Sequence, residues 1–124
     1  MKKTIATNNA PGALGPYSQA VEIGDFIYTS GQLGINPKTG EMPESVEEQT
    51  TLALENAKAI LSEAGLEMKH VIKTMLFIKD MNDFGKINEI YASYFEGDYP
   101  SRSCVEVARL PKDAKIEMEV IAHR

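Results

Sequence analysis

Two stretches near the C-terminal end of this sequence carry the side chains best able to do chemistry. Residues 100–108 alternate like a β-strand, so Arg102, Cys104 and Glu106 project to one side and the residues between them to the other. The planar guanidinium of an arginine binds a carboxylate through two parallel hydrogen bonds, and this orients a small acid better than a lysine does. Arg102 is therefore a candidate carboxylate-binding residue. An edge arginine that pairs with a surface glutamate would give the same alternation.

The second stretch, residues 115–120, places Glu117 and Glu119 on one face of a strand and apolar residues on the other. If this strand pairs antiparallel with the arginine strand across the turn 109–114, one register puts the glutamates on the side of the arginine. A slip of one residue puts them opposite. A glutamate near a bound acid can act as a general base that activates water. Solvated carboxylates on a strand explain the same pattern.

Cys104 is the only cysteine, and a nucleophilic role for it would require an activating base. No histidine lies near it in the sequence, so we expect its side chain to pack as a small hydrophobic group. The two histidines, His70 and His123, lie near no cluster of cysteines or carboxylates with ligand spacing, so we expect no metal site. A single cysteine allows no internal disulfide and favours a reducing compartment.

Length and composition predict one domain that spans residues 1–124. Hydrophobic residues make up 43% and charged residues 25% of the chain, which is ordinary for a globular protein. The formal net charge of -5 argues against nucleic acid and anionic membranes as partners, because both attract a basic surface. No apolar run approaches the ~20 residues of a membrane span, and residues 1–9 lack the apolar stretch of a secretory signal. We therefore expect a cytoplasmic protein.

The elements that must position these side chains follow from local signals. Two helices are expected: the first begins at Ser45, which forms a capping box with Glu48, and ends at Gly65, and the second covers residues 82–96. Gly24-Asp25 is a hairpin signal, and residues 34–43 read as turns. Strand patterns occupy six segments, namely the short segment around Ile5 and residues 18–23, 26–30, 71–79, 102–108 and 115–122. This order predicts an α+β fold, with two helices on one face of a mixed six-stranded sheet.

Two helices leave the second face of such a sheet without cover from this chain. Alternation in residues 71–79 puts Ile72 on the helix side, with Met75 and Phe77 on the uncovered side. We expect Arg102 and Cys104 on the uncovered side as well. A half-apolar open face predicts self-association, although a partly apolar, solvated sheet is the alternative.

Four blocks of the sequence resemble the RidA/YjgF family of reactive intermediate deaminases, and the resemblance extends over essentially the whole chain. These blocks are Gly15–Ala20 (GPYSQA), Thr29–Gln32 (TSGQ), Asn36–Gly40 (NPKTG) and Arg102–Ala114 (RSCVEVARLPKDA). The resemblance implies a chorismate-mutase-like fold that assembles as a homotrimer. In that assembly the sheets form a central barrel, and the active sites lie in the clefts between subunits.

The resemblance also implies an activity, the hydrolysis of 2-aminoacrylate, 2-iminobutyrate and related imines to 2-keto acids and ammonia. Such intermediates escape from pyridoxal-phosphate enzymes, so the role would be metabolite damage control in amino-acid metabolism, without a cofactor. Arg102 would hold the substrate carboxylate, Glu117 would position or activate the attacking water, and Cys104 would contribute main-chain contacts. The remaining pocket residues implied, contributed by the neighbouring subunit, are Tyr17, Ser30, Gly31, Phe84 and Asn88.

Two segments depart from the family pattern, and both bear on access to the pocket. Residues 33–35 (LGI) stand where members often have a proline, and the loop 96–99 before the arginine strand is short. A second function also fits the same residues: a non-catalytic trimer that binds small keto or amino acids and regulates a metabolic partner. It would use the same Arg102 pocket, and only the position of Glu117 favours catalysis. A chaperone-like role fits least well, because it would leave these residues idle.

Overall fold

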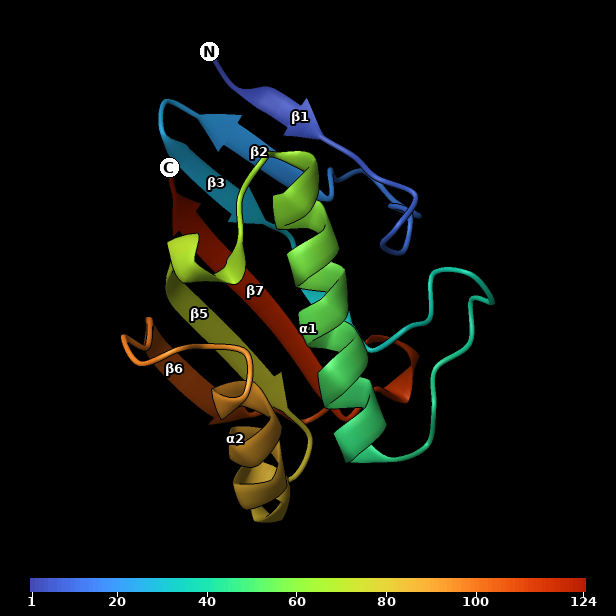
Figure 1. Cartoon of the computed structure of the whole chain (residues 1–124). Helices are drawn as coiled ribbons and strands as arrows, with labels where there is room; N and C mark the ends of the chain where they lie inside the picture. Colours follow the sequence, from blue (N-terminus) through green and yellow to red (C-terminus); the bar gives the residue numbers. More distant parts are fainter.

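The computed structural model describes all residues from Met1 to Arg124 and contains one sheet with two α-helices on one of its faces (Figure 1). The helices are α1 (Val46–Glu63) and α2 (Phe84–Ala92). The strands are β1 (Lys3–Ile5), β2 (Ala20–Ile23), β3 (Phe26–Thr29), β4 (Gln32–Leu33), β5 (Val71–Ile78), β6 (Ser101–Glu106) and β7 (Ile116–His123). The predicted α+β class is confirmed. The sequence analysis missed β4, because a two-residue strand shows no alternation. No helix is both long and apolar enough to cross a membrane.

The strand order is β1-β2-β3-β7-β5-β6, and β4 pairs with β7 beside this path. Every pairing is antiparallel except that of β5 with β6, which is parallel, so the sheet is mixed as predicted. The antiparallel pairing of the last strand with the arginine strand, which the sequence left open, does not form. Helix α2 returns the chain over the sheet, so β6 joins β5 at the outer edge, and β7 lies between β3 and β5 (Figure 1).

Helix α1 follows its sequence signals closely. The hydroxyl of Ser45 accepts a hydrogen bond from the main-chain N–H of Glu48 at the start, and Gly65 follows the end with a φ of +78°. This left-handed backbone is open to glycine at little cost. The face toward the sheet buries a stripe at three- and four-residue spacing, namely Val46, Gln49, Thr50, Ala53, Leu54, Asn56, Ala57, Ile60 and Leu61. This stripe packs on β7 and forms the centre of the core.

Helix α2 is shorter than predicted, since it covers nine residues rather than the whole of 82–96. A separate 3₁₀ turn, Met81–Asp83, comes before it, and the side chain of Asp80 accepts a hydrogen bond from the N–H of Asn82 there. After Ala92 the chain continues in turns that still bury Phe95. The apolar spacing therefore extends beyond the helix itself, and this explains the overestimate.

Two buried polar side chains of α1 fix the neighbouring chain segments. Gln49 accepts a hydrogen bond from the main-chain N–H of Lys115 (2.8 Å), at the start of β7. Asn56 donates to the carbonyl oxygens of Leu33 (3.1 Å) and Ile35 (2.9 Å). A buried amide that lost these partners would carry an unsatisfied polar group. The long turn region after β4 is thereby held against the helix that covers the sheet.

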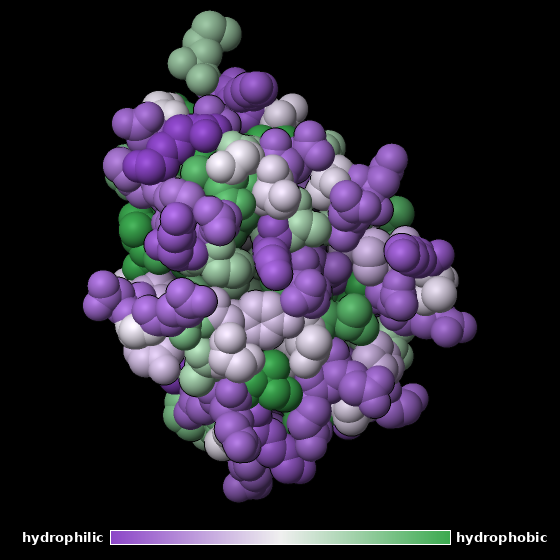
Figure 2. Space-filling model, viewed as in Figure 1, coloured by the Kyte–Doolittle hydropathy of each residue, from purple (hydrophilic) through white to green (hydrophobic).

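The face of the sheet away from the helices is half-apolar, as predicted. It presents Met75 and Phe77 of β5, which are partly exposed, together with the exposed side chains of Tyr28 and Val105. No helix covers it. Figure 2 shows the other, helix-bearing face, on which hydrophilic atoms dominate and hydrophobic ones form small separate areas. The contrast marks the open face as the surface suited to a partner.

One part of the predicted alternation in β5 is wrong. Val71 is 6% exposed and Ile72 is 45% exposed, the reverse of what simple alternation requires. The pairing of β5 with β7 shifts between Val71 and Lys73, so one extra residue changes the side to which the chain points. Beyond this bulge the alternation is regular, and Thr74 lies on the helix face as expected.

Gly34 lies directly against α1 in one of the two segments that depart from the family pattern. A Cβ at Gly34 would stand 2.5 Å from the Cα of Gln49, a backbone atom that cannot move aside alone. We expect Gly34→Ala to lower the free energy of unfolding by about 1–3 kcal/mol, the range for overpacking. Urea denaturation at a fixed protein concentration measures the effect.

The control is Gly12→Ala, since a Cβ at Gly12 meets no atom within 4 Å. Its effect should stay within about 0.5 kcal/mol. Equal stability of both variants would show that Gly34 does not hold this close approach in solution.

Candidate active site

The arginine predicted to bind a carboxylate lies on edge strand β6, beneath helix α2. Arg102 is in register with Thr74 of β5, so its side chain projects toward the helix. Its guanidinium carbon lies 5.3 Å from the ring centroid of Phe84 and 4.8 Å from that of Tyr91, both within cation–π range. Its Nη1 donates a hydrogen bond to Oδ1 of Asn88 (2.8 Å). Two rings and one amide thus fix the orientation of the guanidinium.

This placement corrects two expectations about the strand. Arg102 and Cys104 lie on the helix face of the sheet and not on the open face, because β6 pairs in parallel with β5 and shares the side of its buried residues. Cys104 packs against the core cluster. The place expected for Cys104 on the open face belongs to Val105, which is in register with Phe77.

Arg102 has no carboxylate partner within the chain. The ion pairs of the structure are Lys69–Glu67, Arg109–Asp113 and Arg124–Glu22, and none involves Arg102. The interpretation of Arg102 as an edge arginine neutralised by a surface glutamate is therefore wrong. A half-buried, oriented guanidinium without a counter-charge has the chemistry suited to a planar anion such as a carboxylate.

The free edge of β6 adds main-chain groups beside the arginine. Val107 donates its N–H to the carbonyl oxygen of Ile78 (2.8 Å), so its main chain faces β5. Because successive residues of a strand turn their main-chain groups to alternate edges, those of Arg102 and Cys104 face outward. An anion in the arginine fork would thus lie near outward-facing N–H groups of the edge strand.

The thiol of Cys104 lacks the features of a nucleophile. Burial raises its pKa, and the nearby positive charge of Arg102 lowers it by a smaller amount, so the thiol form is favoured. No hydrogen bond to its sulfur is present. The neighbouring carboxylate on this face, Glu106, accepts a hydrogen bond from the N–H of Met81 (2.8 Å) and so has a structural partner.

Glu117, the predicted base, lies on the opposite face of the sheet. It is in register with Phe77 of β5 and Leu33 of β4, and its side chain is half-buried. Burial raises the pKa of this carboxyl above its ordinary value of 4.5, and the charge of Glu119 raises it further. A carboxyl with a raised pKa is a stronger base than an ordinary one when ionised, which suits proton transfer.

Gly31 makes room for this carboxyl group. A Cβ at Gly31 would stand 2.7 Å from the Cδ atom of Glu117, so only glycine lets the carboxylate lie this close to the backbone. Gly31 and Tyr17 border a cavity of about 360 Å³, and Pro111 and Lys112 also line it. The family pattern predicted both Tyr17 and Gly31 as pocket residues, and the structure places them around one cavity.

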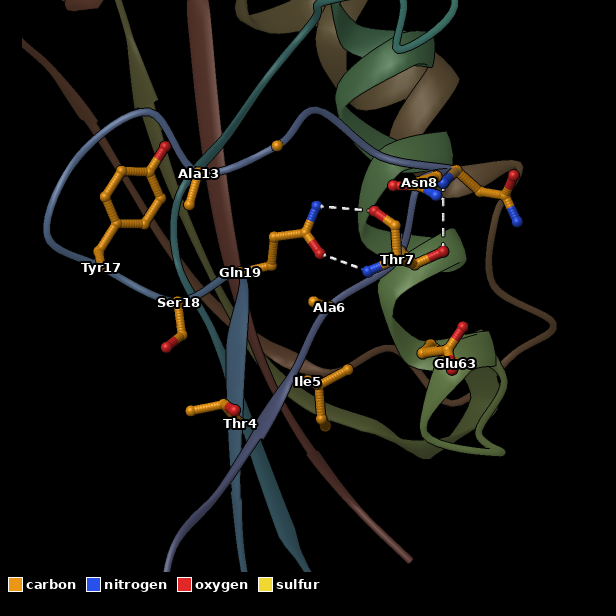
Figure 3. A pocket seen from close by; sticks show the side chains of 12 residues that line it. Thr4, Ile5, Ala6, Thr7, Asn8, Ala13, Tyr17, Ser18, Gln19 and Glu63 are labelled. Carbon is orange, nitrogen blue, oxygen red and sulfur yellow. Dashed lines mark hydrogen bonds between the residues drawn. The ribbon is translucent and has the colours of Figure 1, made fainter.

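Ser30 holds the loop that carries Tyr17. Its hydroxyl donates a hydrogen bond to the carbonyl oxygen of Ser18 (2.6 Å), and its N–H donates to that of Gln19 (2.9 Å). Both groups are therefore engaged within the chain, so Ser30 tethers the loop. Tyr17 itself is 52% exposed, and its ring lies within the bend of that loop (Figure 3).

A larger and more open cavity of about 710 Å³ lies on the other side of Tyr17 (Figure 3). Its central polar side chain, Gln19, is fully engaged: it accepts from the N–H of Thr7 (2.6 Å) and donates to carbonyl oxygens that include that of Thr7 (3.0 Å). Glu63 is the one ionisable acid along the wall. No cation lines this cavity, whereas Lys112 and Gly31 line the smaller one, and Gly31 lies against the carboxyl group of Glu117. The smaller cavity is therefore the better candidate.

The candidate residues thus form two groups that do not meet within one chain. Arg102, Phe84, Asn88 and Cys104 lie on the helix face, whereas Glu117 lies on the open face against Gly31, which borders the smaller cavity together with Tyr17. Phe84 and Asn88 lie against Arg102 and so belong to its group, contrary to the expectation that they complement it from another subunit. Arg102 and Glu117 are two strands and three residues apart in register, roughly 10 Å across and 10 Å along the sheet, on opposite faces.

Tyr91 is the contact residue of this site that the sequence analysis did not select. Its position was visible in the pattern, since Phe84, Asn88 and Tyr91 fall at spacings of four and three residues on one helix face. The helical spacing of Tyr91 is also that of a core residue, and its side chain is buried. No group of three or more histidine, cysteine, aspartate or glutamate side chains is arranged to hold a metal ion.

Comparisons with known proteins extend over nearly the whole chain. The family described as endoribonuclease L-PSP matches residues 7–124. The 2-iminobutanoate/2-iminopropanoate deaminase of Escherichia coli strain K12 is 54% identical over 127 aligned positions, covering 100% of this chain and 99% of that protein.

Two solved structures have nearly the same fold. The crystal structure of E. coli TdcF with bound serine superposes with a TM-score of 0.96 at 53% identity, covering 98% of both chains. The crystal structure of the YjgF gene product from E. coli gives a TM-score of 0.96 at 54% identity, also covering 98% of both chains. The strand order and the two-helix layer are thus those of known relatives.

Proposed function

The chain belongs to the endoribonuclease L-PSP family, which includes the RidA/YjgF deaminases, and from this premise we propose that it is a hydrolytic deaminase of 2-imino acids. Its substrates are 2-aminoacrylate, 2-iminobutyrate and related imines, and its products are 2-keto acids and ammonia. The observation that carries the proposal is Arg102, a half-buried guanidinium that is oriented by two rings and an amide and has no counter-charge. Cysteine usage favours the reducing cytoplasm, the compartment we propose.

The substrate carboxylate binds in the fork of Arg102. The N–H group on the outward edge at Cys104 lies beside that fork and donates a further hydrogen bond to the bound acid. The ring of Phe84 packs against the guanidinium and leaves an apolar wall for the short substrate side chain. This arrangement fixes the position of the imine carbon relative to the enzyme, which is most of what the reaction requires.

The reaction needs only water and one base. Water adds to the C=N carbon while the π electrons of that bond move to nitrogen, and Glu117 takes the proton that water loses. Glu117 passes that proton to the nitrogen, which gives a carbinolamine. The C–N bond then breaks and its electron pair leaves with nitrogen. The hydroxyl oxygen forms the C=O bond of the keto acid, and its proton, carried through Glu117, converts the departing nitrogen to ammonia. An enamine such as 2-aminoacrylate first gains a proton on its terminal carbon to become the imine. Every bond made or broken belongs to substrate or water, so we propose a reaction without metal or cofactor.

A homotrimer with shared sites reconciles the chemistry with the fold. The arginine group and the glutamate group lie on opposite faces of one sheet, so the cavity near Glu117 of one copy must face the Arg102 edge of a neighbour. The half-apolar open face supplies the surface for this association. The domain that trimerises is the whole chain, residues 1–124.

A binding protein without turnover is the second candidate. One relative was crystallised with bound serine, and binding of a small carboxylate alone would require only Arg102. Glu117, with its raised pKa, favours catalysis, because a regulator needs no base beside the ligand. RNA cleavage, which the family description names, is less favoured, since a net charge of -5 opposes binding of a polyanion.

The first test separates binding from turnover. Arg102→Lys keeps the charge but loses the fork, so binding of 2-ketobutyrate and turnover should both fall, each by about tenfold or more. Glu117→Gln keeps shape and removes the base, so binding should persist while turnover falls by about a hundredfold. Calorimetry measures binding, and keto-acid release from enzymatically generated imine measures turnover.

Matched controls exist for both substitutions. Arg109→Lys repeats the first change at an exposed arginine that pairs with Asp113, and Glu119→Gln repeats the second change two residues away. Both controls should keep wild-type turnover at pH 8. If wild-type protein binds 2-ketobutyrate but never accelerates imine hydrolysis, the regulator function replaces the deaminase.

The shared site predicts complementation between inactive variants. Light scattering should give about three times the chain mass of 13.7 kDa. When Arg102→Lys and Glu117→Gln subunits are unfolded together and reassembled in equal amounts, about a quarter of the sites combine an intact arginine with an intact glutamate from a neighbour. Turnover should recover to about that fraction. If turnover does not recover in mixed trimers, both residues belong to the site of one subunit. A stable monomer would contradict the proposed trimer.

The raised pKa of Glu117 predicts the pH dependence of the reaction. The base must be ionised, so kcat/KM should fall as pH falls through the pKa of this carboxyl, at a pH above its ordinary value of 4.5. Glu119→Gln removes the second cause of the shift, so the acid limb should move to lower pH while the rate at pH 8 stays unchanged. An acid limb that Glu119→Gln leaves in place would show that another group titrates.

A further inference from the structure

Tyr91 of α2 packs against the arginine that the proposed function assigns to the substrate carboxylate. Its ring centroid is 4.8 Å from the guanidinium carbon of Arg102, nearer than the ring of Phe84 at 5.3 Å. Tyr91 is only 5% exposed, so its ring is a fixed part of the core and not a surface aromatic that can turn away. The guanidinium of Arg102 therefore packs against a ring that has little freedom to move.

The hydroxyl of Tyr91 is anchored on the strand beside Arg102. It lies 2.7 Å from Oγ1 of Thr74, and Thr74 is the in-register neighbour of Arg102 on β5. Thr74 is 1% exposed, so this hydrogen bond is shielded from water. Burial raises the pKa of Tyr91, with smaller opposing effects from Thr74 and Arg102, so the phenol remains neutral. Tyr91 thus contacts both Thr74 of β5 and Arg102 of β6.

These contacts reduce the entropy that the Arg102 side chain loses when a ligand binds. A free arginine side chain loses rotamer entropy when a ligand fixes it, at a cost of up to about 2 kcal/mol. A guanidinium that already rests on the Tyr91 ring and is bonded to Asn88 has lost that freedom before the ligand arrives. The phenol hydroxyl of Tyr91 is bonded to Thr74. Tyr91 therefore acts by holding Arg102 in place and does not contact the substrate.

We propose that Tyr91, held by Thr74, is a positioning residue that fixes the fork of Arg102 for the substrate carboxylate. The inference rests on the proposed function for the identity of the ligand. It assigns to the Thr74–Tyr91 pair a role in affinity, in addition to its place in the core.

The test compares substitutions that keep or remove the ring. Tyr91→Leu removes the cation–π support, so the affinity for 2-ketobutyrate should fall about tenfold, with KM rising more than kcat falls. Tyr91→Phe keeps the ring and loses only the anchor, so most of the affinity should return. Thr74→Val removes the anchor from the other side and should resemble Tyr91→Phe. Calorimetry with 2-ketobutyrate and steady-state kinetics give both readouts on the full chain.

A neighbouring tyrosine supplies the matched control. Tyr94 also packs against the core and donates its hydroxyl to Glu55 (2.6 Å), but it has no contact with Arg102 within cation–π distance. Tyr94→Leu should lower the melting temperature as Tyr91→Leu does and leave affinity unchanged. Equal losses of affinity in both variants would reduce Tyr91 to a structural residue.

The remaining outcomes distinguish this inference from the proposed function. A folded Tyr91→Leu protein with wild-type affinity overturns the inference while leaving the deaminase intact. If the wild-type protein binds 2-ketobutyrate but does not turn over imines, the deaminase proposal is contradicted. The affinities of the Tyr91 and Tyr94 variants for 2-ketobutyrate still decide the role of Tyr91. A wild-type protein that does not bind 2-ketobutyrate overturns the positioning role together with the role of Arg102.

Discussion

The parallel pairing of β5 with β6 is the constraint on which the rest of the site depends. A parallel neighbour requires a crossover, and α2 supplies it by passing over the sheet between the two strands. The crossover places β6 at the outer edge and puts the helix face that carries Phe84, Asn88 and Tyr91 directly above Arg102. Had β6 paired antiparallel with β7, its neighbours and the cover above Arg102 would both be different. The orientation of one guanidinium is thus a consequence of sheet topology.

On the opposite face of the sheet, the ionised carboxyl group of Glu117 lowers the stability of the fold. The pKa of Glu117 is raised in the folded protein, so its ionised form is less favourable there than in the unfolded chain. Stability is therefore reduced at pH values above the folded pKa, and it increases as pH falls through that value toward 4.5. Gly31 admits the carboxylate to this place, because any side chain there would meet it. Structural stability alone would not select a half-buried, unpaired glutamate, and its presence agrees with a role in proton transfer.

Local signals predicted those parts of the fold that are decided locally. The cap at Ser45, the apolar stripe behind it and Gly65 gave α1 almost to the residue, because capping and helical periodicity act within a few residues. The predicted face of the sheet for Arg102 was wrong, because that face depends on which strand becomes the neighbour of β6. The reversal at Val71 and Ile72 also escaped prediction, since a bulge is fixed by the pairing partner and leaves no pattern in the strand itself. Residue types made Arg102 and Glu117 candidates, whereas helical spacing placed Tyr91 on the same helix face as Phe84 and Asn88, and only the tertiary contacts showed that it packs against Arg102.

The separation of the two groups has a consequence for how activity depends on assembly. A single sheet cannot bring Arg102 and Glu117 to one ligand, because side chains on opposite faces diverge from the same backbone. An isolated chain could therefore bind a carboxylate through Arg102 without a base to activate water. In the proposed trimer, each interface completes a site, so the apolar contacts that hold the subunits together also bring base and substrate within reach. In this proposal, binding depends on the fold of one chain, and hydrolysis depends on the contact between two.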